Sequence, residues 1–167
     1  MYPVKSLQTW LFISLLLISG GVLALSGDKN QAIEIEADSV DIKESEGVSV
    51  YQGNVVLRQG SIEVTADKVT VEHKGGKPSK VVASGGPARF KQRSGDDKPD
   101  MVGQANKMEY RVDSEELILS GKARLSQGKD SFASDRIVYD RVKAVVKAGA
   151  AAKGSERVRI TIQAPKP

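Results

Sequence analysis

Residues 33–42 read Ile-Glu-Ile-Glu-Ala-Asp-Ser-Val-Asp-Ile, and the fold can be worked out from this stretch. Apolar side chains stand at odd positions as far as Ala37 and at even positions from Val40 onward. Alternation with a period of two is typical of a β-strand with one buried face, and a slip of one residue would turn every later side chain outward. We therefore interpret residues 37–39 as a bulge or corner that re-aims the strand, so that both halves face one interior.

The same corner recurs along the chain. Similar four-residue elements begin at residues 37, 66, 105 and 134, and they read Ala-Asp-Ser-Val, Ala-Asp-Lys-Val, Ala-Asn-Lys-Met and Ser-Asp-Arg-Ile. A small residue lets two backbones approach closely, and Asp or Asn can bond to the amides of a turn. No titratable partner recurs with Asp38, Asp67 and Asp135, so we interpret these carboxylates as corner residues and not as catalytic groups.

Period-two alternation continues through the rest of the chain and is interrupted by glycines. This pattern predicts an all-β fold of about sixteen short antiparallel strands, arranged as a sandwich or flattened roll with one long interior. Stacks of repeats do not close on themselves, so the first and last strands should be exposed edges. We expect a single domain over residues 27–163, a polar loop over residues 93–100 and a disordered tail over residues 164–167.

The first 26 residues form a different kind of segment. Lys5 is the only charged residue before Asp28, residues 11–18 are almost entirely apolar, and small residues follow. This order is typical of a cleaved secretory signal peptide, and cleavage after Ala24 or after Ser26 fits equally well. The alternative is an uncleaved membrane anchor. We expect export to a bacterial periplasm or to the exterior.

The composition excludes several classes of function. The chain of 167 residues has no cysteine and one histidine, which rules out thiol catalysis, disulfides and a Cys/His zinc site. Its 25 Lys and Arg and 21 Asp and Glu are interleaved, so nucleic acid is not a favoured partner. No phosphate-binding loop or ATP motif is present. We predict neither an enzyme nor a metal or cofactor; an exported hydrolase would need a clustered acid pair or a site built on His73.

Four segments resemble the OstA-like, or LptA-type, periplasmic lipopolysaccharide-transport proteins. They are residues 33–38, residues 51–60 (Tyr-Gln-Gly-Asn-Val-Val-Leu-Arg-Gln-Gly), residues 66–69 and residues 86–90 (Gly-Pro-Ala-Arg-Phe). The resemblance implies a slightly twisted β-jellyroll, open at both ends, that binds lipid A acyl chains inside. By position, the family's lipid-contacting isoleucines match Ile33 and Ile35, and its contacting phenylalanine matches Phe90.

The resemblance also implies partners. It implies head-to-tail assembly with further copies into a bridge that carries lipopolysaccharide between two membranes. An LptC-like component of an inner-membrane ABC transporter complex would meet the N-terminal end, and an LptD-like outer-membrane translocon would meet the C-terminal end. The chain after Ile162 is short, so functions of longer tails in other members are not assumed.

Inward apolar residues are the candidates for lipid binding. Each methylene left in water costs about 0.8 kcal/mol, so a carrier must cover acyl chains. In any sandwich the same residues are core, and those near an open mouth or seam are the better lipid candidates. We expect smooth aliphatic walls without a buried charge. The candidates are Ile33, Ile35, Val64, Phe90, Met108, Leu119, Phe132, Ile137 and Ile160.

The two ends of the chain carry opposite charges. Glu34 and Glu36 lie on the polar face of the first strand, and Arg157 and Arg159 lie on the last one. If the last strand of one copy adds to the first strand of another, these charges are complementary, and the contact builds fibres. Two alternatives are that the charges keep the edges soluble, or that the strands pair within one molecule.

Two further hypotheses stay open. The chain could be an exported β-sandwich that recognises polysaccharide or protein by strand addition, although its aromatic residues are few. A basic group in the middle of the chain could meet lipid phosphates or be a solvated face. It consists of Lys74, Lys77, Lys80, Arg89, Lys91 and Arg93.

Overall fold

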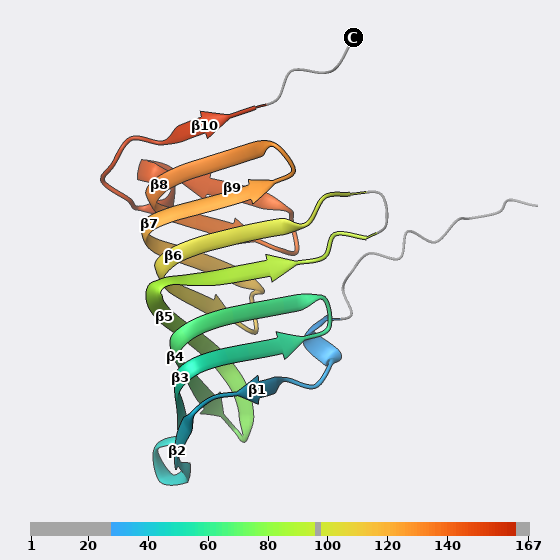
Figure 1. Ribbon diagram of the computed structural model, residues 1–167, viewed down its shortest axis with the longest axis vertical. Coiled ribbons are helices and arrows are strands. Elements are labelled where there is room, and N and C mark those ends of the chain that lie inside the picture. Colours follow the sequence, from blue (N-terminus) through green and yellow to red (C-terminus); the bar gives the residue numbers. More distant parts are fainter. Residues whose placement is uncertain (1–27, 96–97, 163–167) are drawn as a thin grey trace, which may run out of the picture.

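The computed structural model describes residues 28–95 and 98–162. The expected signal peptide, residues 96–97 of the expected loop and the expected tail lie outside the described residues. The rest of that loop lies outside any strand. Within these residues, three short 3-10 turns, η1 (Asp28–Asn30), η2 (Glu44–Glu46) and η3 (Gly149–Ala152), accompany ten strands (Figure 1). The strands are β1 (Glu34–Glu36), β2 (Ser39–Lys43), β3 (Val48–Gln59), β4 (Ile62–Lys74), β5 (Lys77–Gln92), β6 (Met101–Arg111), β7 (Glu116–Gln127), β8 (Asp130–Asp140), β9 (Val145–Ala148) and β10 (Arg159–Thr161).

All strands belong to one unclosed antiparallel sheet. Its order is β1-β3-β4-β5-β6-β7-β8-β10, with β2 also paired to β3 and β9 also paired to β8. Strands β1 and β2 end the sheet on one side, and β9 and β10 end it on the other. The predicted all-β fold with exposed terminal strands is therefore confirmed. Among the described residues, no helix is long and apolar enough to cross a membrane.

The sheet bends at a line of corners into two leaves (Figure 1). We call the leaf that contains β1 and β10 the front leaf, and the leaf that contains β2 and β9 the back leaf. Each of the six long strands β3 to β8 crosses from one leaf to the other at a shift in register. The prediction of about sixteen short strands was wrong in number because these strands run through the corner without a break; counting each long strand twice restores sixteen.

The structure places the repeated Asp residues at the corners, as the sequence predicted. The backbone N–H of Asp38 donates to the carbonyl of Gly53 at 3.0 Å. Asp67 accepts from the N–H of Gly86 at 3.2 Å, and Asp135 accepts from the N–H of Ser155 at 2.7 Å. At all four corners the Asp or Asn side chain packs against a glycine of the neighbouring strand or turn: Asp38 on Gly53, Asp67 on Gly85, Asn106 on Gly121 and Asp135 on Gly154.

The strand register places the core in rows that cross the whole sheet. The main inward row of the front leaf consists of Ile35, Leu57, Val64, Phe90, Gly103, Leu125, Phe132 and Ile160. The main inward row of the back leaf consists of Val40, Tyr51, Val69, Ala83, Met108, Leu119, Ile137 and Ala148. Apolar side chains from the two rows share one core cluster, which forms the interior of the molecule.

Candidate functional site

The candidate site is the apolar trough between the two leaves. Of the nine candidate lipid-binding residues, Ile35, Val64, Phe90, Phe132 and Ile160 lie in the front row and Met108, Leu119 and Ile137 in the back row. Ile33 precedes β1 and packs against the same core. The structure thus brings all nine to the two facing rows or beside them; their contact with lipid stays a prediction.

Burial along the trough changes from the middle to the ends. In the middle, Leu119 and Ile137 are fully buried and Phe90 is 3% exposed. At the β2 end of the sheet, Val40 and Ile42 are 55% and 59% exposed, and at the β10 end Ile160 and Ile162 are 54% and 75% exposed. The trough is therefore packed like a protein core at its centre and presents bare aliphatic surface at both ends.

Sequence reasoning missed four apolar residues of this site. Leu57 and Leu125 belong to the front row, and Val40 and Ile42 supply the exposed surface of β2. A signal for the first two was present, because a shift of the chain by 68 residues places Leu57 on Leu125. Val40 and Ile42 stand in the stretch that revealed the corner, but their exposure follows from the place of β2 at the end of the sheet formed by the described residues.

The expectation of walls without a buried charge was wrong. The side chains of Asp28 and Arg141 are 8% and 4% exposed, and Nη2 of Arg141 donates to Oδ2 of Asp28 at 2.9 Å. The guanidinium carbon of Arg141 lies 5.7 Å from the ring centre of Tyr110, whose hydroxyl accepts from Nη1 at 3.0 Å. Burial raises the pKa of this hydroxyl, and the charge of Arg141 opposes the rise. Oε2 of Glu115 lies 3.7 Å from Nη1 of Arg141.

A pocket of about 40 Å³ lies beside this charged group. Its walls are almost entirely apolar, and Arg141 is the one charged residue among those that line it in the described part of the chain. The lining residues are Ile33, Leu57, Gln59, Ile62, Val64, Val81, Phe90, Tyr110, Val112, Leu117 and Arg141. Three of the nine candidate lipid-binding residues thus meet at this pocket.

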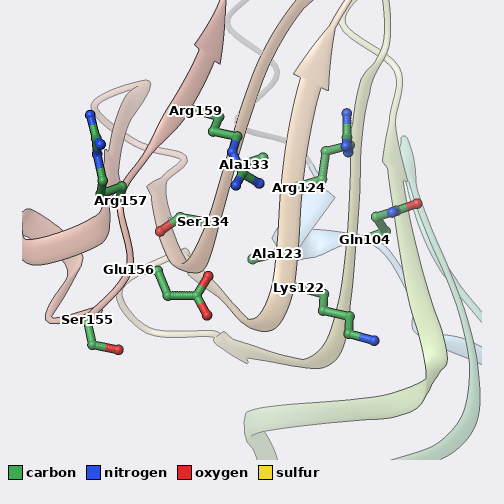
Figure 2. A pocket seen from close by; sticks show the side chains of 10 residues that line it. All are labelled: Gln104, Lys122, Ala123, Arg124, Ala133, Ser134, Ser155, Glu156, Arg157 and Arg159. Atoms are coloured by element: carbon green, nitrogen blue, oxygen red, sulfur yellow. The ribbon is translucent and has the colours of Figure 1, made fainter.

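A second, larger hollow of about 670 Å³ lies on the outer face of the front leaf, next to β10 (Figure 2). Arg124, Ala133 and Arg159 are neighbours across β7, β8 and β10, so the small Ala133 lies between two guanidinium groups. Lys122 and Arg157 add two further cations, and Glu156 is the one carboxylate. The complete lining is Gln104, Lys122, Ala123, Arg124, Ala133, Ser134, Ser155, Glu156, Arg157 and Arg159.

Comparison with known proteins identifies the family. A family model described as "LptA/(LptD N-terminal domain) LPS transport protein" matches residues 34–145. The chain belongs to this family. The lipopolysaccharide export system protein LptH of Pseudomonas aeruginosa is 34% identical over 134 residues, which cover 80% of this chain and 77% of LptH. The lipopolysaccharide export system protein LptA of Escherichia coli K12 is 37% identical over 136 residues, which cover 80% of this chain and 73% of LptA.

The fold of a solved relative agrees with this assignment to the LptA family. The crystal structure of LptH, described as the LptA homologous periplasmic component of the lipopolysaccharide transport device of Pseudomonas aeruginosa, superposes with a TM-score of 0.76 at 29% identity. The match covers 83% of this chain and 99% of that chain. The resemblance seen in the sequence and the jellyroll fold that it implied are confirmed, and the alternative of a polysaccharide or protein binder is not favoured.

The four charged residues predicted at the two edges of this LptA-family chain differ in whether they already form an ion pair. Glu36 already pairs with Arg58 at 2.8 Å, and Arg58 also pairs with Glu63 at 3.2 Å. Among the described residues, no ion pair is formed by Glu34, Arg157 or Arg159. Strand β10 holds Arg159, whereas Arg157 precedes it.

The basic group predicted in the middle of the chain does not form one patch. Lys74, Lys77 and Lys80 lie in the back leaf, whereas Arg89 and Lys91 lie beyond the corner in the front leaf. Lys80 pairs with Glu72 at 2.6 Å, and Lys91 pairs with Asp100 at 3.2 Å. These contacts are typical of a solvated surface.

Within residues 28–95 and 98–162, no group of three His, Asp or Glu side chains could hold a metal ion.

Proposed function

We propose that this protein carries lipopolysaccharide from the inner to the outer membrane by sheltering lipid A acyl chains in its trough, without catalysing a reaction. One observation carries the proposal: an apolar row runs without interruption from β1 to β10, and both ends of the trough expose aliphatic side chains. A sandwich built only for stability would cover those ends, because exposed apolar patches favour association.

The energetics suit a carrier. Several acyl chains of about a dozen carbons each would cost tens of kcal/mol in water, at about 0.8 kcal/mol for each methylene. Aliphatic walls recover this free energy without directional bonds, so chains can slide from one position to the next. The trough tightens in the middle, and entry of chains there would require the leaves to separate around Phe90 and Leu119.

The row could continue from copy to copy. If β10 of one copy pairs antiparallel with β1 of the next in the register that prolongs the sheet, Ile160 lies opposite Ile35. The same register places Arg159 opposite Glu36 and Thr161 opposite Glu34. The cationic hollow beside β10 would then face the acidic first strand, so both apolar continuity and charge support head-to-tail assembly.

We further propose a partner for each end of the bridge. Strands β1 and β2 would meet an LptC-like component of the inner-membrane ABC transporter complex. Strand β10 would meet an LptD-like translocon of the outer membrane. We place the protein in the periplasm after cleavage of its first residues, in agreement with its solved relative, which is described as a periplasmic component.

Photo-crosslinking tests the lipid-binding role. A photoreactive residue at Ile35 or at Phe90 should crosslink to lipopolysaccharide, because both side chains face the trough. The control is Glu63, which lies on the outer face of the same leaf and pairs with Arg58. Equal crosslinking from Glu63 would show that lipid binds to the surface without entering the trough.

A further inference from the structure

Arg141 is a buried cation at the edge of an aliphatic trough. It lies in the turn between β8 and β9, and its Nε is buried and has no hydrogen-bond partner within the described part of the chain. A buried, unpaired donor on a charged group is costly, so it calls for an explanation beyond the stability of the fold.

The surroundings of Arg141 have the chemistry of an amphiphile site. The pocket that it borders is lined by Phe90, Leu57 and Leu117, among others. Such walls match an acyl chain in chemistry, and a chain would enter once the leaves separate, because the closed pocket measures only about 40 Å³. A guanidinium beside these walls would bind an anionic group on that chain through two parallel hydrogen bonds. Tyr110 holds the guanidinium in place through its hydroxyl and its ring.

Asp28 occupies the position of that anionic group in this structure. It is held from the front leaf: Ser61 donates to it through N at 2.8 Å and through Oγ at 2.7 Å, and Gln92 donates through Nε2 at 3.3 Å. Arg141 reaches it from the back leaf. Residues 28–33, which we call the strap, are held further by Gln59, whose Nε2 donates to the carbonyl of Gln31 at 3.1 Å. The strap thus joins the two leaves on the side opposite the corners (Figure 1).

We propose that Arg141 binds the anionic headgroup of an amphiphile whose chain enters the trough, and that Asp28 fills this site when the trough is empty. The inference rests on the proposed function, since it assumes that the trough takes acyl chains. The exchange leaves the buried guanidinium paired before and after, which avoids the large penalty of an uncompensated charge. The carboxylate of Asp28 then moves to solvent together with the strap.

Two amphiphiles with the same chain and different heads test the inference. Dodecyl phosphate and dodecyl maltoside would be titrated into the protein below their micelle concentrations, with calorimetry as the readout. Asp28→Asn keeps an acceptor for Ser61 and removes the competing charge. It should raise the affinity for dodecyl phosphate by about five- to tenfold and leave the affinity for dodecyl maltoside nearly unchanged. Asp41→Asn, an exposed change in β2, is the matched control and should alter neither affinity.

Arg141→Gln should abolish the preference for the phosphate head, and Arg141→Lys should retain part of it, because lysine keeps the charge without the planar fork. If these variants do not fold, the Nε–H resonance of Arg141 in the unaltered protein gives the answer: it should shift with dodecyl phosphate and not with dodecyl maltoside. An equal gain for both amphiphiles in Asp28→Asn, or an unmoved resonance, would overturn the role of Arg141 while the trough still binds chains. Binding of neither amphiphile would contradict the proposed function itself.

Discussion

Asp135 shows how the side chain of a corner residue can contribute to the stability of the fold. Its carboxylate accepts hydrogen bonds from the backbone N–H of Ser155 at 2.7 Å and from the hydroxyls of Ser155 and Ser134 at 3.0 Å. These bonds, led by the one from the Ser155 backbone, lower the pKa of Asp135 to about 2. A carboxyl whose pKa is lower in the folded than in the unfolded chain stabilises the fold above its unfolded pKa, and this contribution is lost as the pH falls through its folded pKa.

The corner at Asp135 should therefore weaken in acid. We expect the melting temperature of the unaltered protein to fall between about pH 4 and pH 2 more steeply than that of Asp135→Asn, which has no carboxylate to protonate. Asp113→Asn, a change at an exposed turn position, is the control and should follow the unaltered protein. If the melting temperatures of Asp135→Asn and of the unaltered protein fall in parallel as the pH is lowered, the carboxylate of Asp135 does not stabilise the corner.

Gly53 is required at its corner for two reasons. Its φ is +79°, a conformation that other residues rarely adopt, and an added Cβ would collide with the carboxylate of Asp38. Gly53→Ala should lower the free energy of unfolding by about 2–4 kcal/mol, measured by urea denaturation. Gly76→Ala is a matched control, because Gly76 has a φ of +75° with nothing within 4 Å of the added Cβ. It should cost only about 1 kcal/mol. Equal losses would show that the Asp38 contact is unimportant.

The strand type and the corners were predictable from the sequence, because the alternation of apolar and polar residues along each strand determines them. Alternation and its slip at residues 37–39 predicted the corner, because a buried face tolerates no change of parity without a bend. The number of strands was not predictable, because the same slip in parity marks the break between β1 and β2 and the bends inside the long strands. Backbone hydrogen bonding through the register shift distinguishes the two cases, and the sequence pattern does not report it.

The buried pair of the trough was beyond sequence reasoning for a different reason. Asp28 and Arg141 stand 113 positions apart, and each lies where a charged residue is normally solvated, one near the start of the domain and one in a turn. Only the folding of the sheet into two leaves brings a turn of the back leaf within reach of the strap. Periodicity reports which face a residue takes within its own strand and contains no information on contacts of this kind.

Strands β1 and β10 make the proposed assembly testable by register. The chain has no cysteine, so single cysteines can be placed in separate copies and oxidised after mixing. In the register that prolongs the sheet, Glu36→Cys should form a disulfide with Arg159→Cys, and Glu34→Cys with Thr161→Cys. The crossed mixtures, Glu36→Cys with Thr161→Cys and Glu34→Cys with Arg159→Cys, are displaced by two residues, or about 7 Å, and should crosslink poorly.

Electrophoresis without reductant would score the four mixtures. Equal yields from matched and crossed mixtures would show that the copies meet without a fixed strand register, and a preference for the crossed mixtures would show a different register.

The molecule as a whole is a folded sheet whose two ends are unlike. One end exposes Val40 and Ile42 beside the acidic β1, and the other exposes Ile160 and Ile162 beside the cationic hollow. Ends that are alike would favour closed dimers, whereas unlike ends that fit each other build an open chain of copies. The same asymmetry gives the trough a direction, because every copy in such a chain points the same way.

Charge at the β10 end should control this assembly. Reversal of two cations in Arg157→Glu with Arg159→Glu places carboxylates beside the acidic β1 of the next copy, so the mean size measured by light scattering should fall toward that of the monomer. The control is Lys77→Glu with Lys107→Glu, which makes the same change in net charge at exposed positions on strands away from both ends. If the two double variants lose assembly equally, net charge alone would explain the effect. If neither loses it, the apolar ends hold the copies together without help from the hollow.

High salt should weaken assembly of the unaltered protein and restore part of it in the Arg157→Glu and Arg159→Glu variant, because screening reduces both the attraction and the repulsion between exposed charges.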